Sequence, residues 1–237
     1  MERYNTAYRA GTATQTAEYD EGLRAYMLKV YNYMASGVLL TGIVSMMVSQ
    51  SQAMMQAIFS GPQAYIVMFA PFAFVLVMSF GVHKMKASTL QAIFWAYAGT
   101  MGLSLSSIFL VYSGESIART FFITAAAFGA LSLYGYTTKK SLSGMGTFLM
   151  MGLFGLIIAS VVNMFMQSTM MEFVISVVGV LVFAGLTAYD TQRIKENYAM
   201  LPPGDAIAKG AIMGALSLYL DFVNLFLMLL RLLGNRE

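Results

Sequence analysis

Seven long apolar stretches, separated by short polar segments, divide the chain. Each has about the 20 mostly apolar residues that a helix needs to cross a bilayer. They lie at residues 27–49, 63–83, 88–112, 115–137, 145–166, 171–192 and 208–233. Pro202 and Pro203 make the last connection a non-helical loop. The pattern predicts an all-α, polytopic membrane protein. Its seven-helix transmembrane bundle would occupy residues 26–237, after a polar, flexible cytoplasmic tail at residues 1–25.

The composition agrees with a membrane protein and excludes several other classes. The chain is 58% hydrophobic and 11% charged, with a mean hydropathy of +0.68, whereas soluble domains carry about 25% charged residues. It has no cysteine and a single histidine, His83, which excludes thiolate sites and multi-histidine metal centres. The basic residues are scattered through short loops, which indicates topology signals rather than a nucleic-acid surface. We therefore expect the lipid bilayer as a partner, no nucleic acid and no tightly bound cofactor.

The distribution of lysine and arginine predicts the orientation, because short cytoplasmic loops carry an excess of both. With the N-terminus inside, eleven of the basic residues fall on the cytoplasmic side and three, Arg119, Arg231 and Arg236, on the other. This predicts a cytoplasmic N-terminus and an external C-terminus. A re-entrant last helix would instead return the C-terminus to the inside.

Small residues in the third and fourth stretches predict close helix packing, since they let backbones approach each other in lipid. The residues concerned are Gly99, Gly102, Ser104, Ser106 and Ser107, then Gly129, Ala130, Ser132 and Gly135. Lining a pathway is the alternative role for them.

Two carboxylates lie within apolar stretches, Asp190 near the end of the sixth and Asp221 inside the seventh. An unpaired charge at the bilayer centre costs about 2.5–3.5 kcal/mol on insertion scales. Both aspartates are therefore expected to face the protein interior or a water-filled cavity.

The aspartates have polar neighbours at helical spacing. Gly214, Ser217, Asp221 and Asn224 recur every three or four residues and form one stripe on the last helix, while Thr187 shares a face with Asp190. The helix rise places Asp190 about 8 Å and Asp221 about 18 Å from the cytoplasmic interface. Direct contact between them therefore requires a tilted or broken helix.

Two carboxylates that meet in a low dielectric cannot both ionise cheaply, so they would share one proton. Deprotonation would split the pair or attract a cation, and hard oxygen ligands suit Ca²⁺. Asp190 and Asp221 are thus candidates for a transient calcium site. The alternative is that both only hold hydrogen bonds or salt bridges between helices.

His83 lies at the cytoplasmic end of the second stretch, on the same side as Asp190. A lone histidine beside Lys84 is typical of a solvated interface residue. A proton-sensitive partner of the acidic pair is the functional alternative. The candidate partners of the pair are thus His83, Asn224, Thr187 and Ser217.

Four segments resemble the Bax inhibitor-1 family of membrane proteins, also called transmembrane Bax inhibitor motif proteins, in its bacterial branch. They read FWAYAGTMGLSLSSIFLVYS, ARTFFITAAAFGALSLYGYTTKKSLS, GLTAYDTQRIK and ALSLYLDFVNLFLMLLRLLG, and the similarity covers residues 22–236. It implies six helices around a central seventh, and a Ca²⁺ leak with Asp190 and Asp221 as a pH-sensitive latch. It also implies a bacterial inner membrane. Where some relatives have an arginine on the second helix that bonds the latch, this chain has His83.

The expected function is a passive, pH-sensitive calcium leak channel that closes on protonation, and not an enzyme. One alternative is a membrane-embedded regulatory partner that binds another membrane protein and modulates proteolysis or stress and cell-death responses. A remote alternative is an intramembrane aspartyl protease. Such proteases resemble one another in a Gly-x-Gly-Asp motif, whereas Gly204–Asp205, in the polar loop, is the only Gly-Asp here.

Overall fold

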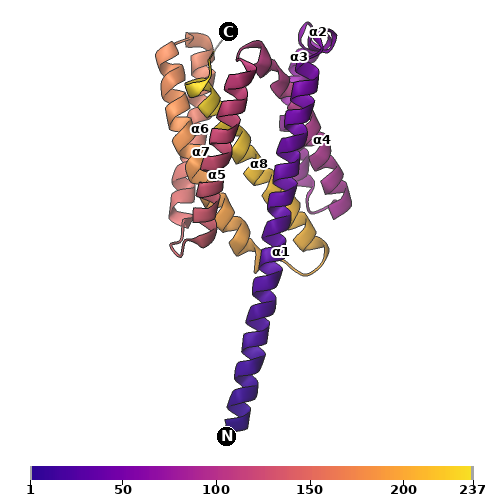
Figure 1. The fold of residues 1–237 in the computed structure, drawn as a ribbon, viewed down its shortest axis with the longest axis vertical. Coiled ribbons are helices and arrows are strands. Elements are labelled where there is room, and N and C mark those ends of the chain that lie inside the picture. The colour runs from indigo at the N-terminus through magenta and orange to yellow at the C-terminus, as the bar shows by residue number, and fades with distance from the viewer. Residues whose placement is uncertain (1, 236–237) are drawn as a thin grey trace.

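The computed structural model describes the backbone of residues 2–235 and the side chains of residues 19–235. Within these residues every regular element is helical (Figure 1). The elements are α1 (Glu2–Ser49), α2 (Gln52–Phe59), α3 (Gln63–Gly81), α4 (Ala87–Leu105), the 3₁₀ helix η1 (Ser106–Leu110), α5 (Gly114–Thr137), α6 (Ser143–Met166), α7 (Thr169–Tyr198) and α8 (Asp205–Leu233).

Seven helical segments in the described part are long and apolar enough to cross a membrane. They are α1 from Tyr19 onward, α3, α4 with η1, α5, α6, α7 and α8. Each coincides with one of the apolar stretches, which confirms the all-α, seven-span prediction.

Capping residues define several helix ends. The Ser113 hydroxyl accepts a hydrogen bond from the Ser116 N–H at the start of α5, and Ser168 does the same for Met171 at the start of α7. Gly204, with φ of +93°, precedes α8. Residues that carry a side chain rarely adopt that backbone conformation, so glycine suits the turn between the proline pair and α8.

Two elements differ from the expected pattern. The connection after the first span contains α2, which Ser51 caps by accepting from Met54 N. The third span ends in η1, where Ser106 and Ser107 donate to carbonyls three residues back. Hydroxyl groups that bond to nearby backbone carbonyls compete with regular helix, and 3₁₀ turns are frequent at helix ends.

The N-terminal segment is helical, since α1 is continuous from Glu2 into the first span and projects beyond the other helices (Figure 1). Residues 2–25 contain no proline, and a helix extends more easily from a formed helix than it nucleates. The core contacts of α1 include Leu23 and Tyr26. The boundary between tail and bundle at residue 25 stays a prediction.

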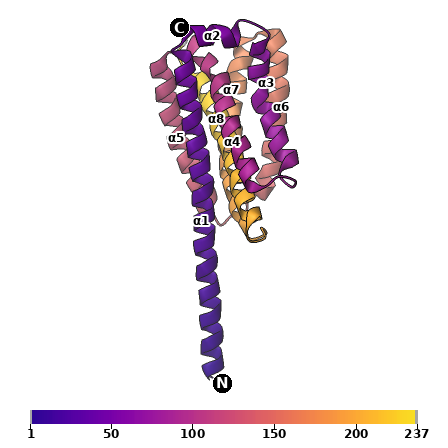
Figure 2. The same ribbon diagram turned by 90° about the vertical axis from the view of Figure 1, so that its right-hand side faces the viewer.

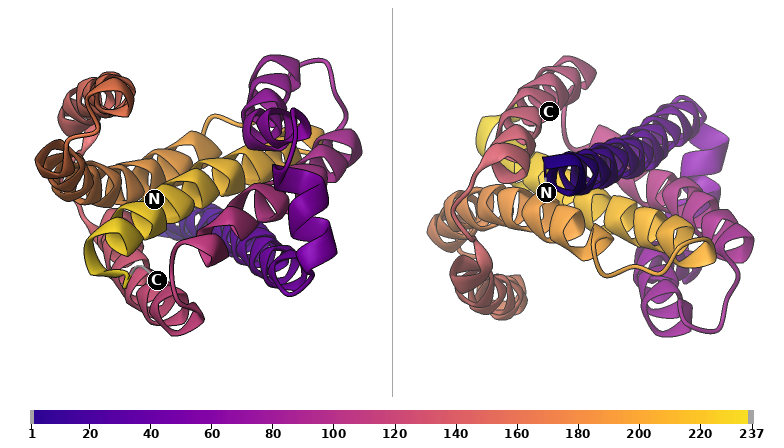
Figure 3. Two further views of the ribbon diagram at one scale, coloured as in Figure 1. Left: turned by 90° about the horizontal axis from the view of Figure 1, so that it is seen from above. Right: turned by 90° about the horizontal axis from the view of Figure 1, so that it is seen from below.

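The most buried span is α8. In its apolar window 61% of the residues are buried, against 11–33% in the other spans. It packs against α1, α4, α5 and α7 and runs through the middle of the helices when seen from above and below (Figure 3). Helix α3 packs on α4, and α6 packs on α7. The finer arrangement, with six helices surrounding the seventh, stays a prediction.

The two chain ends lie at opposite ends of the bundle (Figures 1 and 2). Because α8 is a single helix of 29 residues, it crosses the bundle once. The structure therefore favours a crossing last span over the re-entrant alternative.

Close packing by small residues holds at some of the expected positions. A Cβ on Gly135 would clash with the backbone of Ala188 in α7, and one on Gly102 would clash with α1. A Cβ on Gly99 or Gly129 would meet nothing within 4 Å. The prediction of close helix packing thus holds for Gly102 and Gly135 but not for Gly99 and Gly129.

Candidate functional site around Asp190 and Asp221

Asp190 lies on the inner face of α7 and is 8% exposed. Its Oδ1 is 3.3 Å from an Nη atom of Arg193, one turn further along the same helix. Arg193 also donates to the Ser217 hydroxyl of α8 over 3.3 Å. Residues three apart are neighbours on a helix surface, so α7 itself supplies the cation that its buried carboxylate needs.

Arg193 was not among the site residues expected from the sequence. It was counted with the basic residues that indicate topology, and the arginine that bonds the latch in some relatives lies on the second helix, where this chain has His83. The structure places the arginine of the site on α7 instead. The spacing of three residues from Asp190 was the signal that could have identified it.

Asp221 lies on α8 and is 5% exposed. It interacts electrostatically with both Asp190 and Arg193, so the two aspartates are brought into one site. Its Oδ2 atom is buried without a hydrogen-bond partner. Figure 1 shows α8 running obliquely across the bundle. The aspartates lie at different predicted depths, and a tilted helix is one of the two ways in which they could approach each other.

Of the four other candidate partners, Ser217 contacts a residue of the site, whereas Thr187, Asn224 and His83 make other contacts or are exposed. Ser217 lies in the site, where Arg193 bonds it. Thr187 and Asn224 donate to carbonyls of their own helices, to Phe183 and Leu220 respectively, each over 2.8 Å. His83 is exposed in the turn after α3. Its position agrees with a solvated interface residue.

Further side chains fix the end of α7 that carries the site. Gln192 accepts from Leu142 N over 2.7 Å and donates to Lys140 O over 2.9 Å. Lys195 donates to the Tyr136 carbonyl at the end of α5 over 2.8 Å. These bonds tie the turn of Asp190 to α5 and to the segment between α5 and α6.

A chain of hydroxyl groups joins three helices next to Asp190. The Tyr31 hydroxyl of α1 is 2.6 Å from the Ser132 hydroxyl of α5, which is 2.9 Å from the Thr191 hydroxyl of α7. Thr191 in turn donates to the Thr187 carbonyl. The hydroxyl groups that form this chain are thus satisfied, in contrast to the Oδ2 atom of Asp221.

A hollow of about 440 Å³ opens beside the site at the end of the bundle that holds the N-terminus. Arg193 and Ser217 line it, together with Tyr26 of α1, Asn197 of α7 and Gly214 of α8. The hollow therefore reaches the residues that contact Asp190.

Beyond Asp221 the interior is filled by apolar side chains. Leu225, Phe226 and Leu230 of α8 are each at most 6% exposed. Phe226 and Leu230 pack with Tyr112 and Ile117. Polar access to the site thus comes from the N-terminal end of the bundle, while apolar side chains follow Asp221 toward the other end.

Comparison with known proteins adds the family. The family model described as inhibitor of apoptosis-promoting Bax1 matches residues 23–237. The chain is 46% identical over 219 residues to inner membrane protein YbhL of Escherichia coli K12, covering 91% of this chain and 94% of that protein. It is 49% identical over 226 residues to RP147 of Rickettsia prowazekii, covering 95% and 96% respectively. A membrane protein of Streptococcus pyogenes serotype M3, SpyM3_0260, is 34% identical over 220 residues, covering 92% and 96%.

These similarities extend over nearly the whole of each chain. Together with the seven spans, they make the chain a multi-pass integral protein of the inner membrane. It belongs to the Bax inhibitor-1 family.

Proposed function

We propose that this protein is a pH-sensitive calcium leak channel of the inner membrane, gated by Asp190 and Asp221. The observation that carries the proposal is the site itself. Two buried carboxyl groups from adjacent membrane-spanning helices interact around a single guanidinium group.

The charge of this trio gives the direction of the pH response. With Asp221 protonated, ionised Asp190 and Arg193 balance each other and the site is neutral. With both aspartates ionised, the site has a net charge of −1 in a buried environment. An uncompensated buried charge is strongly unfavourable, so a rise in pH weakens the packing of α8 on α7 and a fall in pH restores it. The gate therefore closes on protonation and opens on deprotonation.

The same oxygen atoms would attract the ion. Ca²⁺ takes six to eight oxygen ligands in resident sites. The described residues hold no group of three or more histidine, aspartate or glutamate side chains that could bind a metal. Two carboxylates and the Ser217 hydroxyl suit a passing ion better than a resident one. The hollow lined by Arg193 and Ser217 would lead the ion to them from the predicted cytoplasmic side.

On this proposal the aspartates titrate rather than catalyse, and the protein is not an enzyme. Asp205, the aspartate of the Gly-Asp pair, has a different role. Its carboxylate accepts from Ala87 N at the start of α4 over 3.2 Å and pairs with Lys209 over 2.9 Å. It caps a neighbouring helix and is not part of an acidic pair.

The test is calcium flux into liposomes that contain the purified protein, across roughly pH 6–8. Wild-type flux is expected to rise with pH, and Asp190→Asn and Asp221→Asn are each expected to lose that dependence. Asparagine keeps the shape of aspartate and removes the proton equilibrium. Asp20→Asn, an exposed carboxylate on α1, is the control and is expected to behave as wild type.

Wild-type protein that passes no more calcium than empty liposomes at any pH would contradict the channel. Wild-type flux that does not depend on pH would contradict gating by the aspartates, although the protein would still be a calcium leak channel.

One observation favours a second function, a regulatory partner of another membrane protein. Helix α1 is 48 residues long, or about 72 Å at 1.5 Å per residue, whereas about 20 residues cross a bilayer. Its N-terminal part projects from the bundle as a helix that a partner could bind. The flux experiment separates the two functions, because a purely regulatory protein moves no ions by itself.

A further inference from the structure

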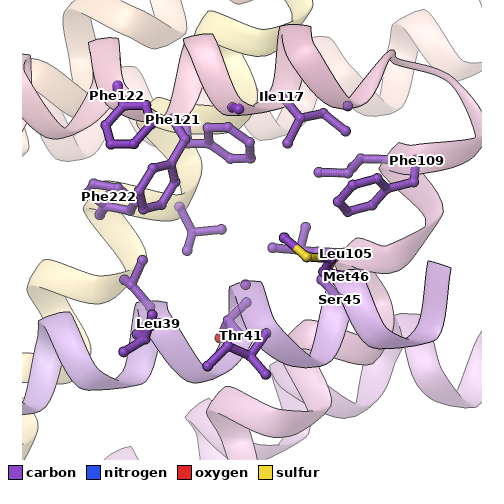
Figure 4. Close-up of a pocket in the computed structure, with 18 of the residues that line it drawn as sticks. Leu39, Thr41, Ser45, Met46, Leu105, Phe109, Ile117, Phe121, Phe122 and Phe222 are labelled. Atoms are coloured by element: carbon purple, nitrogen blue, oxygen red, sulfur yellow. The ribbon is translucent and has the colours of Figure 1, made fainter. Parts of the chain in front are cut away.

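A second hollow lies between α1 and α5, near the ends of these helices that are remote from the N-terminus (Figure 4). Its volume is about 400 Å³, within the range of ligand pockets. Leu39 and Met46 come from α1, Phe109 from η1, and Phe121 and Phe222 from α5 and α8. We refer to it as the α1–α5 pocket.

The α1–α5 pocket opens sideways between two membrane-spanning helices. Leu39, Ile43 and Met47 of α1 and Phe122 of α5 all line it, and all are exposed on the surface of the bundle. The surface around a membrane span faces the hydrocarbon chains of the bilayer. Lipid is therefore the medium in contact with the opening.

The lining of the α1–α5 pocket excludes polar headgroups and ions. None of its lining residues is charged, and its hydroxyl groups are those of Thr41 and Ser45. The Thr41 hydroxyl is already bonded to the Ala98 carbonyl over 2.8 Å and to the Tyr219 hydroxyl over 2.6 Å. An apolar chain fits such a wall.

Ser45 is the exception in this wall. The residue is 4% exposed, and its Oγ atom is buried with no hydrogen-bond partner. A buried polar group without a partner is costly, and each such group in a folded protein requires an explanation. A ligand with an acceptor oxygen at the depth of Ser45 would explain the missing partner of its Oγ atom.

The depth of Ser45 in the bilayer indicates which ligand oxygen would accept its hydrogen bond. Ser45 precedes the end of α1 at Ser49 by four residues, which is about 6 Å along the helix axis. A span end lies near the headgroup region, so Ser45 lies near the boundary between headgroups and hydrocarbon. The ester carbonyl groups of glycerophospholipids lie at this boundary.

We propose that the α1–α5 pocket binds one acyl chain of a glycerophospholipid from the leaflet remote from the N-terminus. On binding, the Ser45 side chain, whose Oγ atom is buried in this structure, rotates about χ1 and donates a hydrogen bond to the ester carbonyl. The chain extends from Ser45 toward Leu39 and packs on Phe222 and Val223, the residues that follow Asp221. The lipid thereby fills the side of α8 that α1 and α5 leave open.

Photo-crosslinking tests the site directly. The purified full-length protein is placed in nanodiscs in which a small fraction of the phosphatidylethanolamine carries a diazirine in its acyl chain. Crosslinked peptides are then mapped by mass spectrometry. Residues 38–47 and 117–122 are expected to be labelled well above Phe154, Ile157 and Ile158 of α6, which form an exposed apolar surface outside the pocket.

Two glycines give a matched pair of variants. Gly42 lines the pocket, Gly155 lies on the exposed surface of α6, and a Cβ at either would meet nothing within 4 Å. Gly42→Phe is expected to reduce pocket labelling to the level of α6, and Gly155→Phe to leave pocket labelling unchanged. Equal melting temperatures of the two variants would establish that Gly42→Phe folds.

The ester contact is tested with a dialkyl ether analogue of the same lipid, which lacks the carbonyl. Wild type is expected to prefer the ester by about fivefold, the size of one ordinary hydrogen bond. Ser45→Ala, which keeps the shape of the pocket, is expected to lose that preference.

Pocket labelling no higher than that of α6, or unaffected by Gly42→Phe in a folded variant, would overturn the proposal. A wild type that binds ester and ether lipids equally would overturn the role of Ser45. None of these results depends on calcium flux.

Discussion

Arg193 is a cation in contact with Asp190, and its charge acts on Asp221 as well. Both aspartates could be identified from the sequence, because a carboxyl group inside an apolar stretch is anomalous at first reading. Arg193 was not identified, although it lies three residues after Asp190, because a basic residue near the end of a span is ordinary. Its contact with Ser217 depends on the packing of α7 against α8, which no local pattern encodes.

At this scale we predict the effect of Arg193→Gln. Removing the positive charge makes ionisation of the pair less favourable, so the calcium flux should rise at a higher pH than in the wild type. The Arg193 side chain is 45% exposed, and solvent screening reduces the contribution of such a pair to about 1 kcal/mol or less. The expected shift of the flux midpoint is therefore below roughly one pH unit.

Two controls accompany Arg193→Gln. Arg193→Lys keeps the charge and should recover part of the shift, although an ammonium group lacks the planar, extended shape with which the guanidinium group reaches both Asp190 and Ser217. Arg24→Gln removes an exposed arginine on α1 at the same end of the bundle and should leave the midpoint in place. An unchanged midpoint in Arg193→Gln would exclude Arg193 from the gate.

At the scale of the helices, the apolar pattern predicted seven spans well but not the details of their ends. Helix α2 was missed because its eight residues are too few to cross a membrane. The 3₁₀ segment η1 was read as a continuation of the third span. Both depend on local hydrogen bonds of serine side chains, which average hydropathy does not register.

The packing of α5 on α7 gives a prediction at this scale. Gly135→Ala would place a Cβ against the backbone of Ala188, two residues before Asp190. Inserting an atom into a close contact costs about 1–3 kcal/mol, which corresponds to a melting temperature lower by roughly 2–12 °C in a chain of this size.

Gly129→Ala is the matched control on the same helix. Its Cβ would meet nothing within 4 Å. Alanine in a helix is favoured over glycine by about 0.5–1 kcal/mol, so this variant should melt at the same or a slightly higher temperature. Thermal unfolding of both variants in one detergent decides the matter, and a Gly135→Ala protein as stable as Gly129→Ala would show that the contact is not tight.

At the scale of the whole molecule, the topology can be measured because the sequence contains no cysteine. The two ends lie at opposite ends of the bundle, and the basic residues predict a cytoplasmic N-terminus. In spheroplasts, a membrane-impermeant maleimide should therefore label Asn235→Cys. It should label Asp20→Cys only after permeabilisation. The wild-type protein gives the unlabelled background.

Met200→Cys, in the exposed segment between α7 and α8, extends the topology test. It lies at the same end as the N-terminus and should follow Asp20→Cys. Labelling of Asp20→Cys and Met200→Cys in intact spheroplasts, with Asn235→Cys protected, would invert the topology. Labelling of Asp20→Cys and Asn235→Cys from the same side would mean that α8 does not cross the membrane.

The sequence by itself determined the membrane class, the number of spans and their approximate positions, and Asp190 and Asp221 as the buried carboxyl groups. These follow from hydropathy along one dimension, because the bilayer imposes a fixed length and excludes isolated charge. Only the tertiary structure decided that Arg193 and Ser217 join the pair, that His83 stays outside it, and that α1 and α5 leave a pocket beside Ser45. Those features depend on how helices tilt and approach each other, which is set by contacts between residues far apart in the chain.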